Sequence, residues 1–231
     1  MGDAIKPIQS IAILGGTGKE GKGLAFRWAR AGYKIIIGSR SLDKAMAAVE
    51  DIKGYLKQGG LVEAMLNPDA AAAADLAVLT VPFAAHREML ESIKSSVQGK
   101  ILVDVTVPLV PPRVTRVQMP PAGSAAQEAQ QILGEGVLVV SAFQNISYEN
   151  LLTQEDIDCD ILVCGSGKAS RELVVDLIKA AGLVAWDAGP LENSVVVEGL
   201  TSILIGINKQ YGVKSSGIKI TGVGGTEKIT K

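Results

Sequence analysis

The residues of this chain that could do chemistry gather near its start, where glycines follow a short apolar run. Gly16, Gly18 and Gly21 come soon after Ile11–Leu14 and have the spacing G-x-G-x-x-G. Glycines in this pattern let the backbone approach a pyrophosphate, which then lies at the positive end of the following helix. The residues after Gly21 have a helical apolar period, so the motif has the strand–turn–helix context it requires. The pattern predicts a dinucleotide-binding loop.

A second group of residues indicates which dinucleotide this loop binds. Ser39 and Arg40 follow the apolar run Ile35–Gly38, at the position where an NAD enzyme usually carries a carboxylate for the ribose hydroxyls. A carboxylate there would repel a 2′-phosphate, whereas an arginine attracts one. Lys44 follows one helical turn later. The alternative is that Arg40 is a solvated residue beside a loop, but the three residues together favour NADP(H) and a redox enzyme.

Residues suited to other chemistries are scarce. The chain lacks the patterns G-x-S-x-G, H-E-x-x-H, C-x-x-C and Tyr-x-x-x-Lys. Its single histidine, His86, follows Val81–Phe83 and could touch a cofactor or substrate, although we favour an ordinary polar helix position. Hydride transfer between two organic cofactors needs orientation and little else from the protein. We therefore assign no catalytic side chain and expect a second redox ligand over the nicotinamide.

The cysteines and the composition exclude several further classes. Cys159 and Cys164 cannot form a disulfide framework and fit no strong metal spacing, so we expect buried thiols and no metal. The 231 residues have a net charge of −1 and only 4% aromatic residues, which argues against nucleic acid as a partner. No apolar run reaches the roughly 18 residues of a membrane helix, and the first residues lack an apolar signal region. We expect a soluble cytoplasmic protein without a membrane partner.

Apolar runs and helical periods alternate through the first half of the chain. Strands are predicted near 9–14, 34–38, 61–65, 76–81, 100–105 and 137–142, and helices near 19–31, 41–56, 68–74, 83–97 and 124–133. Continuous apolar strands joined by helices are typical of parallel sheets covered on both faces. The fold class is therefore α/β, with a Rossmann-type doubly wound parallel sheet.

The second half is organised differently. The proline-rich segment 106–124 cannot be a regular helix or a central strand, and its Arg113 and Arg116 belong either to an active-site rim or to a surface connection. Strands near 160–165 and 183–186, helices near 168–181 and 191–211 and a loose tail at 212–231 predict a smaller α/β C-terminal domain. We expect residues 1–145 to form the NADP-binding domain and residues 146–231 to close a cleft for the second ligand.

Several longer stretches resemble one enzyme family. They are Gly15–Ala25 with Ile35–Arg40, Leu79–Pro82, Val140–Phe143, Leu162–Gly165 and Trp186–Ser194. Together they resemble the NADPH-dependent reductases of the deazaflavin coenzyme F-420, also called F-420:NADP oxidoreductases. The resemblance runs through nearly the whole chain. The run Asp187–Leu191 is more specific than the glycine loop, which many dinucleotide proteins share.

The resemblance implies NADP(H) and coenzyme F-420 as ligands, a direct hydride transfer between them and a small homo-oligomer, a dimer or a tetramer. By position it implies a phosphate loop, a 2′-phosphate site and a nicotinamide site. The phosphate loop falls on Thr17, Gly18, Lys19 and Glu20, with Gly16 and Gly21 beside them. The 2′-phosphate site falls on Ser39, Arg40 and Lys44, and the nicotinamide site falls on Val81, Pro82 and Phe83. The deazaflavin site falls near 143–148, on Gln144 and Ile146.

The chain departs from the family pattern at one of these positions. After Val140–Ala142 the family usually carries a histidine beside the deazaflavin, and here Gln144 stands at that place. A glutamine can form a hydrogen bond with the ring but cannot carry a positive charge. Two other functions stay open: an NADP-dependent reductase of a small imine or carbonyl, and a redox sensor that holds NADP(H) without turnover. The strands near 160–165 and 183–186 argue against the first, whose relatives usually have a mostly helical second domain.

Overall fold

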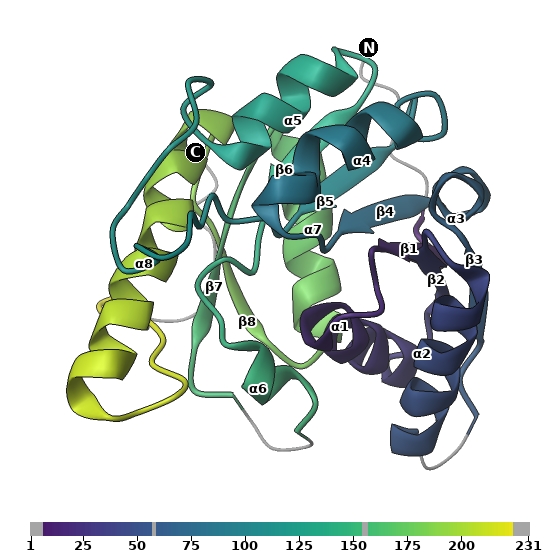
Figure 1. The fold of residues 1–231 in the computed structure, drawn as a ribbon, viewed down its shortest axis with the longest axis horizontal. Coiled ribbons are helices and arrows are strands. Elements are labelled where there is room, and N and C mark those ends of the chain that lie inside the picture. The colour runs from purple at the N-terminus through teal and green to yellow at the C-terminus, as the bar shows by residue number, and fades with distance from the viewer. Residues whose placement is uncertain (1–6, 57–58, 154–156, 224–231) are drawn as a thin grey trace.

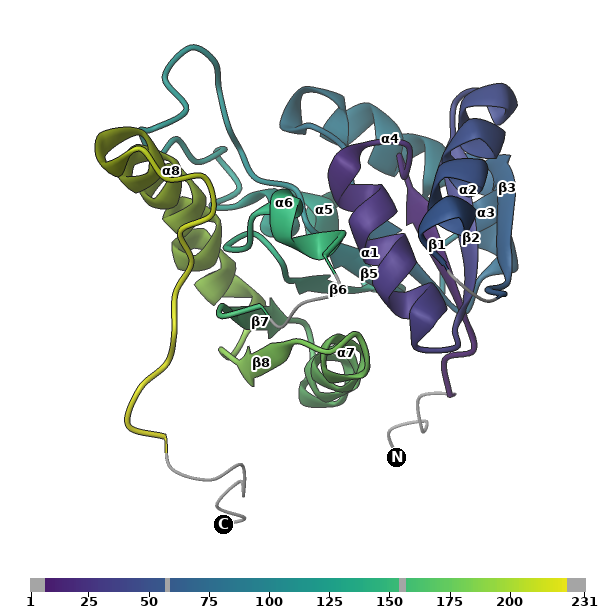
Figure 2. The same cartoon turned by 90° about the horizontal axis from the view of Figure 1, so that it is seen from below.

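The computed structural model describes residues 7–56, 59–153 and 157–223, which form one twisted sheet covered by helices (Figures 1 and 2). The eight strands have the spatial order β3-β2-β1-β4-β5-β6-β7-β8. The first six strands are parallel and follow the order typical of a Rossmann fold. The predicted fold class, an α/β protein with a doubly wound parallel sheet, is confirmed.

The strands and helices alternate along the chain. The strands are β1 (Ser10–Leu14), β2 (Lys34–Ser39), β3 (Val62–Leu66), β4 (Leu76–Leu79), β5 (Ile101–Asp104), β6 (Leu138–Ser141), β7 (Asp160–Gly165) and β8 (Val184–Asp187). The helices are α1 (Lys19–Arg30), α2 (Leu42–Tyr55), α3 (Asn67–Ala73), α4 (His86–Ile93), α5 (Ala125–Leu133), α6 (Tyr148–Leu151), α7 (Lys168–Ala180) and α8 (Ser194–Tyr211). Two short 3-10 helices, η1 (Phe83–Ala85) and η2 (Leu191–Asn193), precede α4 and α8.

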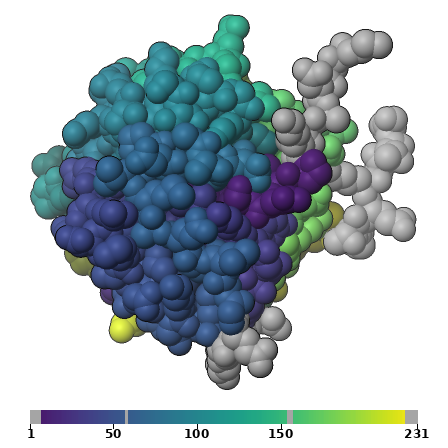
Figure 3. Space-filling model, turned by 90° about the vertical axis from the view of Figure 1, so that its right-hand side faces the viewer, coloured from purple at the N-terminus to yellow at the C-terminus, as the bar shows by residue number. Residues whose placement is uncertain are grey.

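Two apolar cores lie on opposite faces of the sheet. Side chains of β1 and β2 pack with α1, α2 and α7 on one face, around the buried Trp28. The other core is formed with α3, α4 and α5 and includes Leu90 and Leu133. Strands whose side chains point into both cores must be apolar throughout, which explains the continuous apolar runs of β1, β2 and β4. Figure 3 views the molecule from the β3 edge, where the first half of the chain forms most of the visible surface.

The second half of the chain extends this sheet. β7 pairs with β6 in the antiparallel direction, and β8 pairs with β7 in parallel. Gly165 permits the close approach of β7, because a Cβ atom there would lie 2.9 Å from Val140 Cγ2. The predicted boundary between residues 1–145 and 146–231 is not marked by a break in the sheet, and the division into two domains stays a prediction. The last part of the predicted tail, residues 224–231, lies outside the described residues.

Segment 106–124 contains no helix or strand, as its prolines predict. It runs from the end of β5 to α5 and passes along α8, where the Ser202 hydroxyl donates to the Arg116 carbonyl at 3.3 Å. α8 itself lies at the end of the molecule opposite α2 and β3 (Figures 1 and 2). The helix α8 therefore rests on an irregular segment as well as on β7.

A buried arginine on α1 joins three segments that are far apart in sequence. The Arg27 guanidinium donates from Nε to the Leu151 carbonyl at 2.9 Å and from Nη1 to the Ala181 carbonyl at 3.2 Å. Its Nη2 also donates to the carbonyls of Asn150 and Thr153, both at 3.1 Å. The carbonyls at the end of α6, of which that of Leu151 is buried and the other two are part-buried, thus find donors that the helix itself does not supply. Arg27 thereby fixes α6 against α1.

Candidate active site

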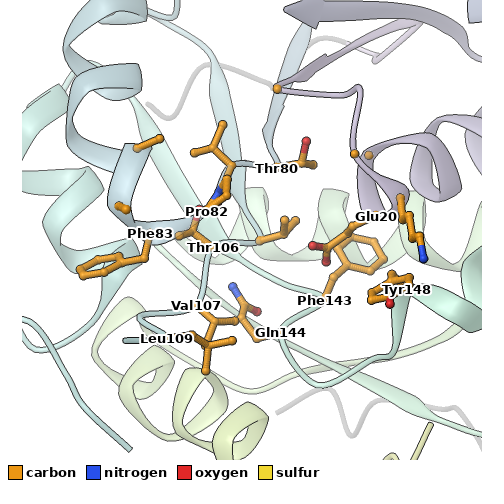
Figure 4. A pocket seen from close by; sticks show the side chains of 18 of the residues that line it. Glu20, Thr80, Pro82, Phe83, Thr106, Val107, Leu109, Phe143, Gln144 and Tyr148 are labelled. Atoms are coloured by element: carbon orange, nitrogen blue, oxygen red, sulfur yellow. Dashed lines mark hydrogen bonds between the residues drawn. The ribbon is translucent and has the colours of Figure 1, made fainter. Parts of the chain in front are cut away.

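One large cavity lies at the carboxyl ends of the parallel strands. It measures about 1510 Å³, and residues that directly follow β1, β2, β4, β5 and β6 line it. Ligands of open α/β sheets bind at this edge, where the strand order reverses between β1 and β4. Because a pocket for one small-molecule ligand usually measures roughly 300–1,000 Å³, this cavity is large enough for two ligands. Figure 4 shows ten labelled side chains in it, contributed by both halves of the chain.

The glycine loop forms one wall of this cavity. Thr17, Gly18, Lys19, Glu20 and Gly21 line it, whereas Gly16 is buried beneath. A Cβ atom on Gly16 would lie 2.6 Å from the Ile13 carbonyl oxygen, and one on Gly21 would lie 2.7 Å from Gly16 Cα. These two glycines therefore let the loop and α1 pack against β1, while the residues between them face the ligand space. The backbone N–H groups at the start of α1 are the donors that a pyrophosphate requires.

The predicted 2′-phosphate residues lie together at one end of the cavity. Ser39, Arg40 and Lys44 all line it. The Ser39 hydroxyl oxygen accepts from the Ser41 amide at 3.2 Å, so its own proton remains available to a ligand. The Ser41 side chain in turn begins α2 by accepting from the Lys44 amide. Arg40 is exposed, as a residue that binds a phosphate at a cavity mouth can be.

The predicted nicotinamide residues lie on the opposite side of the glycine loop. Val81, Pro82 and Phe83 follow β4 and line the cavity beside Thr80 (Figure 4). The Thr80 hydroxyl donates to the Leu14 carbonyl at 2.9 Å, which ties the end of β4 to β1. A dinucleotide that spans the switch point between these two strands would run from Arg40 past the glycine loop to this group.

The two predicted second-ligand residues also line the cavity, on a wall whose other members could not be predicted from the sequence. Gln144 and Ile146 follow β6 and belong to this wall. Its other members come from α6, from α8 and from the segment after α8: Ser147, Tyr148, Thr201, Leu204, Ile205, Asn208, Lys214 and Ser216. We refer to this group with Phe143–Ile146 as the β6–α8 wall. No local motif marks these members, because only the packing of α6 and α8 brings them to β6.

Gln144 is held in one orientation on this wall. It is buried, and its side-chain Nε2 donates to the Asp104 backbone carbonyl at 2.7 Å, while the Gln144 backbone carbonyl accepts from the Thr201 hydroxyl at 2.5 Å. Because a carbonyl can only accept, the amide nitrogen must face Asp104. The Oε1 atom then has no hydrogen-bond partner among the described residues. A buried acceptor left unpaired on a cavity wall marks a place where a ligand donor would fit.

The preceding residue, Phe143, has an unusual backbone. Its φ is +77°, a left-handed conformation that is rare for a bulky side chain. The ring is buried and packs edge-on against Trp28 with ring centroids 5.7 Å apart. Backbone strain of this kind costs about 1–3 kcal/mol, and the packing of the buried ring compensates for it. This turn directs the chain from β6 across the cavity toward α6.

His86 is not among the residues that line the cavity, and it occupies the helix position that we favoured, although it is buried there. It begins α4, is completely buried, and its Nε2 lies 2.7 Å from Asp104 Oδ2. Its Nδ1 lies 4.0 Å from Glu128 Oε1. Burial opposes a charge on the ring, but the Asp104 carboxylate outweighs it and raises the pKa of His86. This pair could not be predicted from the sequence, because His86 begins α4 whereas Asp104 ends β5, and only the packing of α4 on the sheet brings them together.

The remaining candidate residues are also placed by the structure. Thr106, Val107, Leu109, Pro111 and Val114 of the proline-rich segment line the cavity, but Arg113 and Arg116 are not among the lining residues. The segment is thus an active-site rim without the predicted arginine contacts. Both cysteines are buried, and burial raises the pKa of the Cys164 thiol to about 11. Among the described residues, no helix is long and apolar enough to cross a membrane.

The sheet order, the glycine loop and the cavity at the strand ends define a dinucleotide-binding protein of the Rossmann class. The family described as NADP oxidoreductase, coenzyme F420-dependent, matches residues 10–108. A protein of Methanocaldococcus jannaschii named "F420-dependent NADP reductase" is 42% identical over 219 residues, which cover 91% of this chain and 97% of the relative. The protein of the same name from Methanothermobacter thermautotrophicus is 41% identical, over 93% of this chain and 95% of the relative.

A solved structure supports the same assignment at the level of the fold. It is a candidate F420-dependent NADP reductase from Arthrobacter sp. FB24, with a TM-score of 0.77, 23% identity, and coverage of 93% of this chain and all of that chain. The chain belongs to the F420-dependent NADP reductase family.

Proposed function

We propose that this protein is an oxidoreductase that transfers a hydride between NADP(H) and the deazaflavin coenzyme F-420. The observation that carries the proposal is the single cavity that joins a glycine loop and Arg40 to the β6–α8 wall, where Gln144 Oε1 lacks a partner. Two planar ligands can therefore meet at the end of β4. The close relatives carry the corresponding name.

The nucleotide would be held by the first half of the chain. The amides of Thr17–Glu20 would bind the pyrophosphate at the start of α1, and Ser39, Arg40 and Lys44 would bind the 2′-phosphate. Val81, Pro82 and Phe83 would then contact the nicotinamide. The close packing at Gly16 and Gly21 fits this assignment, because a side chain at either position would displace the loop that binds the pyrophosphate.

The acceptor would be held by the β6–α8 wall. The amide of Gln144 already donates to Asp104, so its oxygen would accept a hydrogen bond from a ring N–H of the deazaflavin. Ile146 would contact the same ring. A histidine at this position could donate and carry a charge, whereas Gln144 binds the ring without adding charge.

The protein would accelerate the reaction mainly by orientation. The cavity walls would hold both rings near contact distance and exclude water from between them, and such positioning contributes several kcal/mol. Buried, proton-retaining thiols such as Cys164 have no redox role in this scheme. The hydride then passes directly from the nicotinamide to the acceptor, in a ternary complex and without a covalent intermediate.

Steady-state kinetics and isotope transfer test this proposal. Initial rates measured against NADPH and the deazaflavin should give intersecting lines, and deuterium from the labelled nicotinamide carbon should appear in the reduced deazaflavin. Parallel lines, or loss of all the deuterium to solvent, would refute direct transfer. NADPH oxidation by an imine or carbonyl instead would establish the first alternative function. Tight NADPH binding without turnover of any acceptor would establish the sensor.

We also propose a role for each part of the chain, an oligomeric state and a cellular location. Residues 1–145 would bind the nucleotide and supply Gln144 to the acceptor, and residues 146–231 would close the cleft around the acceptor, since α6 and α8 line the same cavity. A homo-oligomer would form through α8, whose outer face exposes Val196, Ile203 and Tyr211 to 65%, 51% and 69%. Sedimentation of an Ile203→Glu variant tests this contact. A cytoplasmic location agrees with NADP(H) as a substrate.

A further inference from the structure

Glu20 occupies a central place in the cavity that phosphate binding does not explain. It belongs to the first turn of α1 and lines the cavity, and in the view of Figure 4 its carboxyl group points away from α1 into the cavity. The adjacent Gly21 holds this turn close to the end of β4, because a Cβ atom there would lie 3.0 Å from Thr80 Oγ1. Glu20 therefore lies where the nicotinamide end of a dinucleotide meets the β6–α8 wall.

The carboxyl group has no hydrogen bond or ion pair among the described residues. The nearest cation on its own helix, Lys19, places its ammonium 5.2 Å from the Tyr148 ring centroid. Other ionisable groups also line the cavity, from α6, the end of β2, α2, α4 and the segment after α8: Tyr148, Arg40, Lys44, Glu88 and Lys214. The Glu20 side chain is half-buried at the cavity wall, and the desolvation of its carboxyl there raises the pKa to about 8 without a contribution from a neighbouring charge.

We propose that Glu20 is the proton-exchanging partner of the nicotinamide ring. Its carboxylate faces the cationic oxidised ring of NADP⁺, and its protonated carboxyl faces the neutral reduced ring of NADPH. A half-buried carboxylate without a partner gains from a cation placed beside it, whereas a neutral ring placed there removes water from the carboxylate and supplies no compensating charge. This inference rests on the proposed function, because it requires the nicotinamide to lie beside β4.

The exchange closes the proton balance of the proposed reaction. In the direction of deazaflavin reduction, the hydride leaves C4 of the reduced nicotinamide and forms a C–H bond at C5 of the deazaflavin. The deazaflavin also gains one proton at N1. Glu20 loses one proton as the nicotinamide becomes a cation, so the proton lost by the carboxyl equals the proton gained by the acceptor. Water returns a proton to Glu20 when NADP⁺ leaves.

Binding of the two nucleotides at different pH values, with no acceptor present, tests the inference. The dissociation constant of NADPH divided by that of NADP⁺ should rise about tenfold or more between pH 6.5 and pH 9.5, since a cation close to a carboxyl shifts its pKa by roughly 1–3 units. The 2′-phosphate, which titrates near pH 6, is common to both nucleotides and cancels in this ratio. Calorimetry in two buffers should show proton release when NADP⁺ binds near pH 7.5.

Two variants complete the experiment. Glu20→Gln keeps the shape of the side chain and should make the ratio independent of pH and abolish proton release. Glu149→Gln, which removes an exposed carboxyl beside Tyr148, should leave both unchanged. A flat ratio in the unmodified protein, or a persistent pH dependence in Glu20→Gln, would overturn the inference while NADP(H) binding stood. If neither nucleotide bound at any pH, the proposed function would fail, and this inference with it.

Discussion

Arg27 offers a direct measure of what holds the β6–α8 wall in place. We expect Arg27→Met to destabilise the protein strongly, although methionine fills much of the same volume. The guanidinium donates to four backbone carbonyls, three of them at the end of α6 and one after α7. Methionine supplies no donor, so these carbonyls lose partners that backbone groups away from water need.

The size of the loss follows from the number of contacts and their exposure. A hydrogen bond to a charged group contributes about 1.5–3 kcal/mol, but the end of α6 is close enough to solvent for water to replace some partners. The two fully buried bonds, to the carbonyls of Leu151 and Ala181, therefore predict a loss of roughly 3–6 kcal/mol for Arg27→Met. Arg27→Lys should lose about half as much, because an ammonium keeps the charge but cannot fork between α6 and α7.

Urea unfolding of the variants measures this difference, with the slope of the transition as a check on two-state behaviour. Arg30→Met is the matched control, since Arg30 lies one turn along α1, is exposed, and contacts the Phe26 ring at 5.5 Å. We expect it to cost less than about 1 kcal/mol. Equal losses for Arg27→Met and Arg30→Met would refute the assignment of Arg27 as the link between α1 and α6.

Further predictions concern ligand binding and pH. Arg40→Ala should weaken NADPH binding about ten- to a hundredfold, the equivalent of one charge-assisted contact, and NADH binding much less; equal losses would show that Arg40 does not bind the 2′-phosphate. Gln144→Ala should change the Michaelis constant or turnover for the acceptor and leave the NADPH dissociation constant unchanged. Cys159→Ser and Cys164→Ser should retain most activity in the same assay. Burial raises the pKa of Glu198 to about 8 from 4.5, so the stabilisation from its bound proton is complete below pH 4.5 and is lost as the pH rises toward 8. The free energy of unfolding should therefore fall between pH 5 and pH 8, with a smaller slope in Glu198→Gln.

Most elements of the fold could be predicted because their signals are local. The apolar runs of β1, β2 and β4 and the cap at Ser41 depend on neighbours in sequence, and the structure places them within a few residues of the prediction. The antiparallel joining of β6 and β7 could not be predicted, because it depends on a close approach at Gly165 that only the assembled sheet requires. The single turn α6 was also missed, since four residues carry too little periodicity.

The candidate site divides in the same way. The glycine loop and Arg40 follow strands directly, so their positions along the chain imply their positions in space. Tyr148, Thr201 and Lys214 reach the cavity only because Arg27 fixes α6 and because α8 packs near β7. Glu20 lies between these cases: the sequence places it in the phosphate loop, and the structure turns its carboxyl into the cavity.

The polar groups behind the β6–α8 wall explain why that wall can be rigid without being apolar. Asp104 joins them, since its carboxylate bonds the His86 ring and its carbonyl accepts from Gln144. A deeper carboxyl, that of Glu198 on α8, accepts from the Ala125 amide at 2.7 Å and so caps the start of α5. Replacing such groups by apolar residues could stabilise the fold, but each polar contact also excludes other packings of the same elements. We infer that these polar groups orient the side-chain amide of Gln144, so that its oxygen is already directed at the acceptor before the acceptor binds.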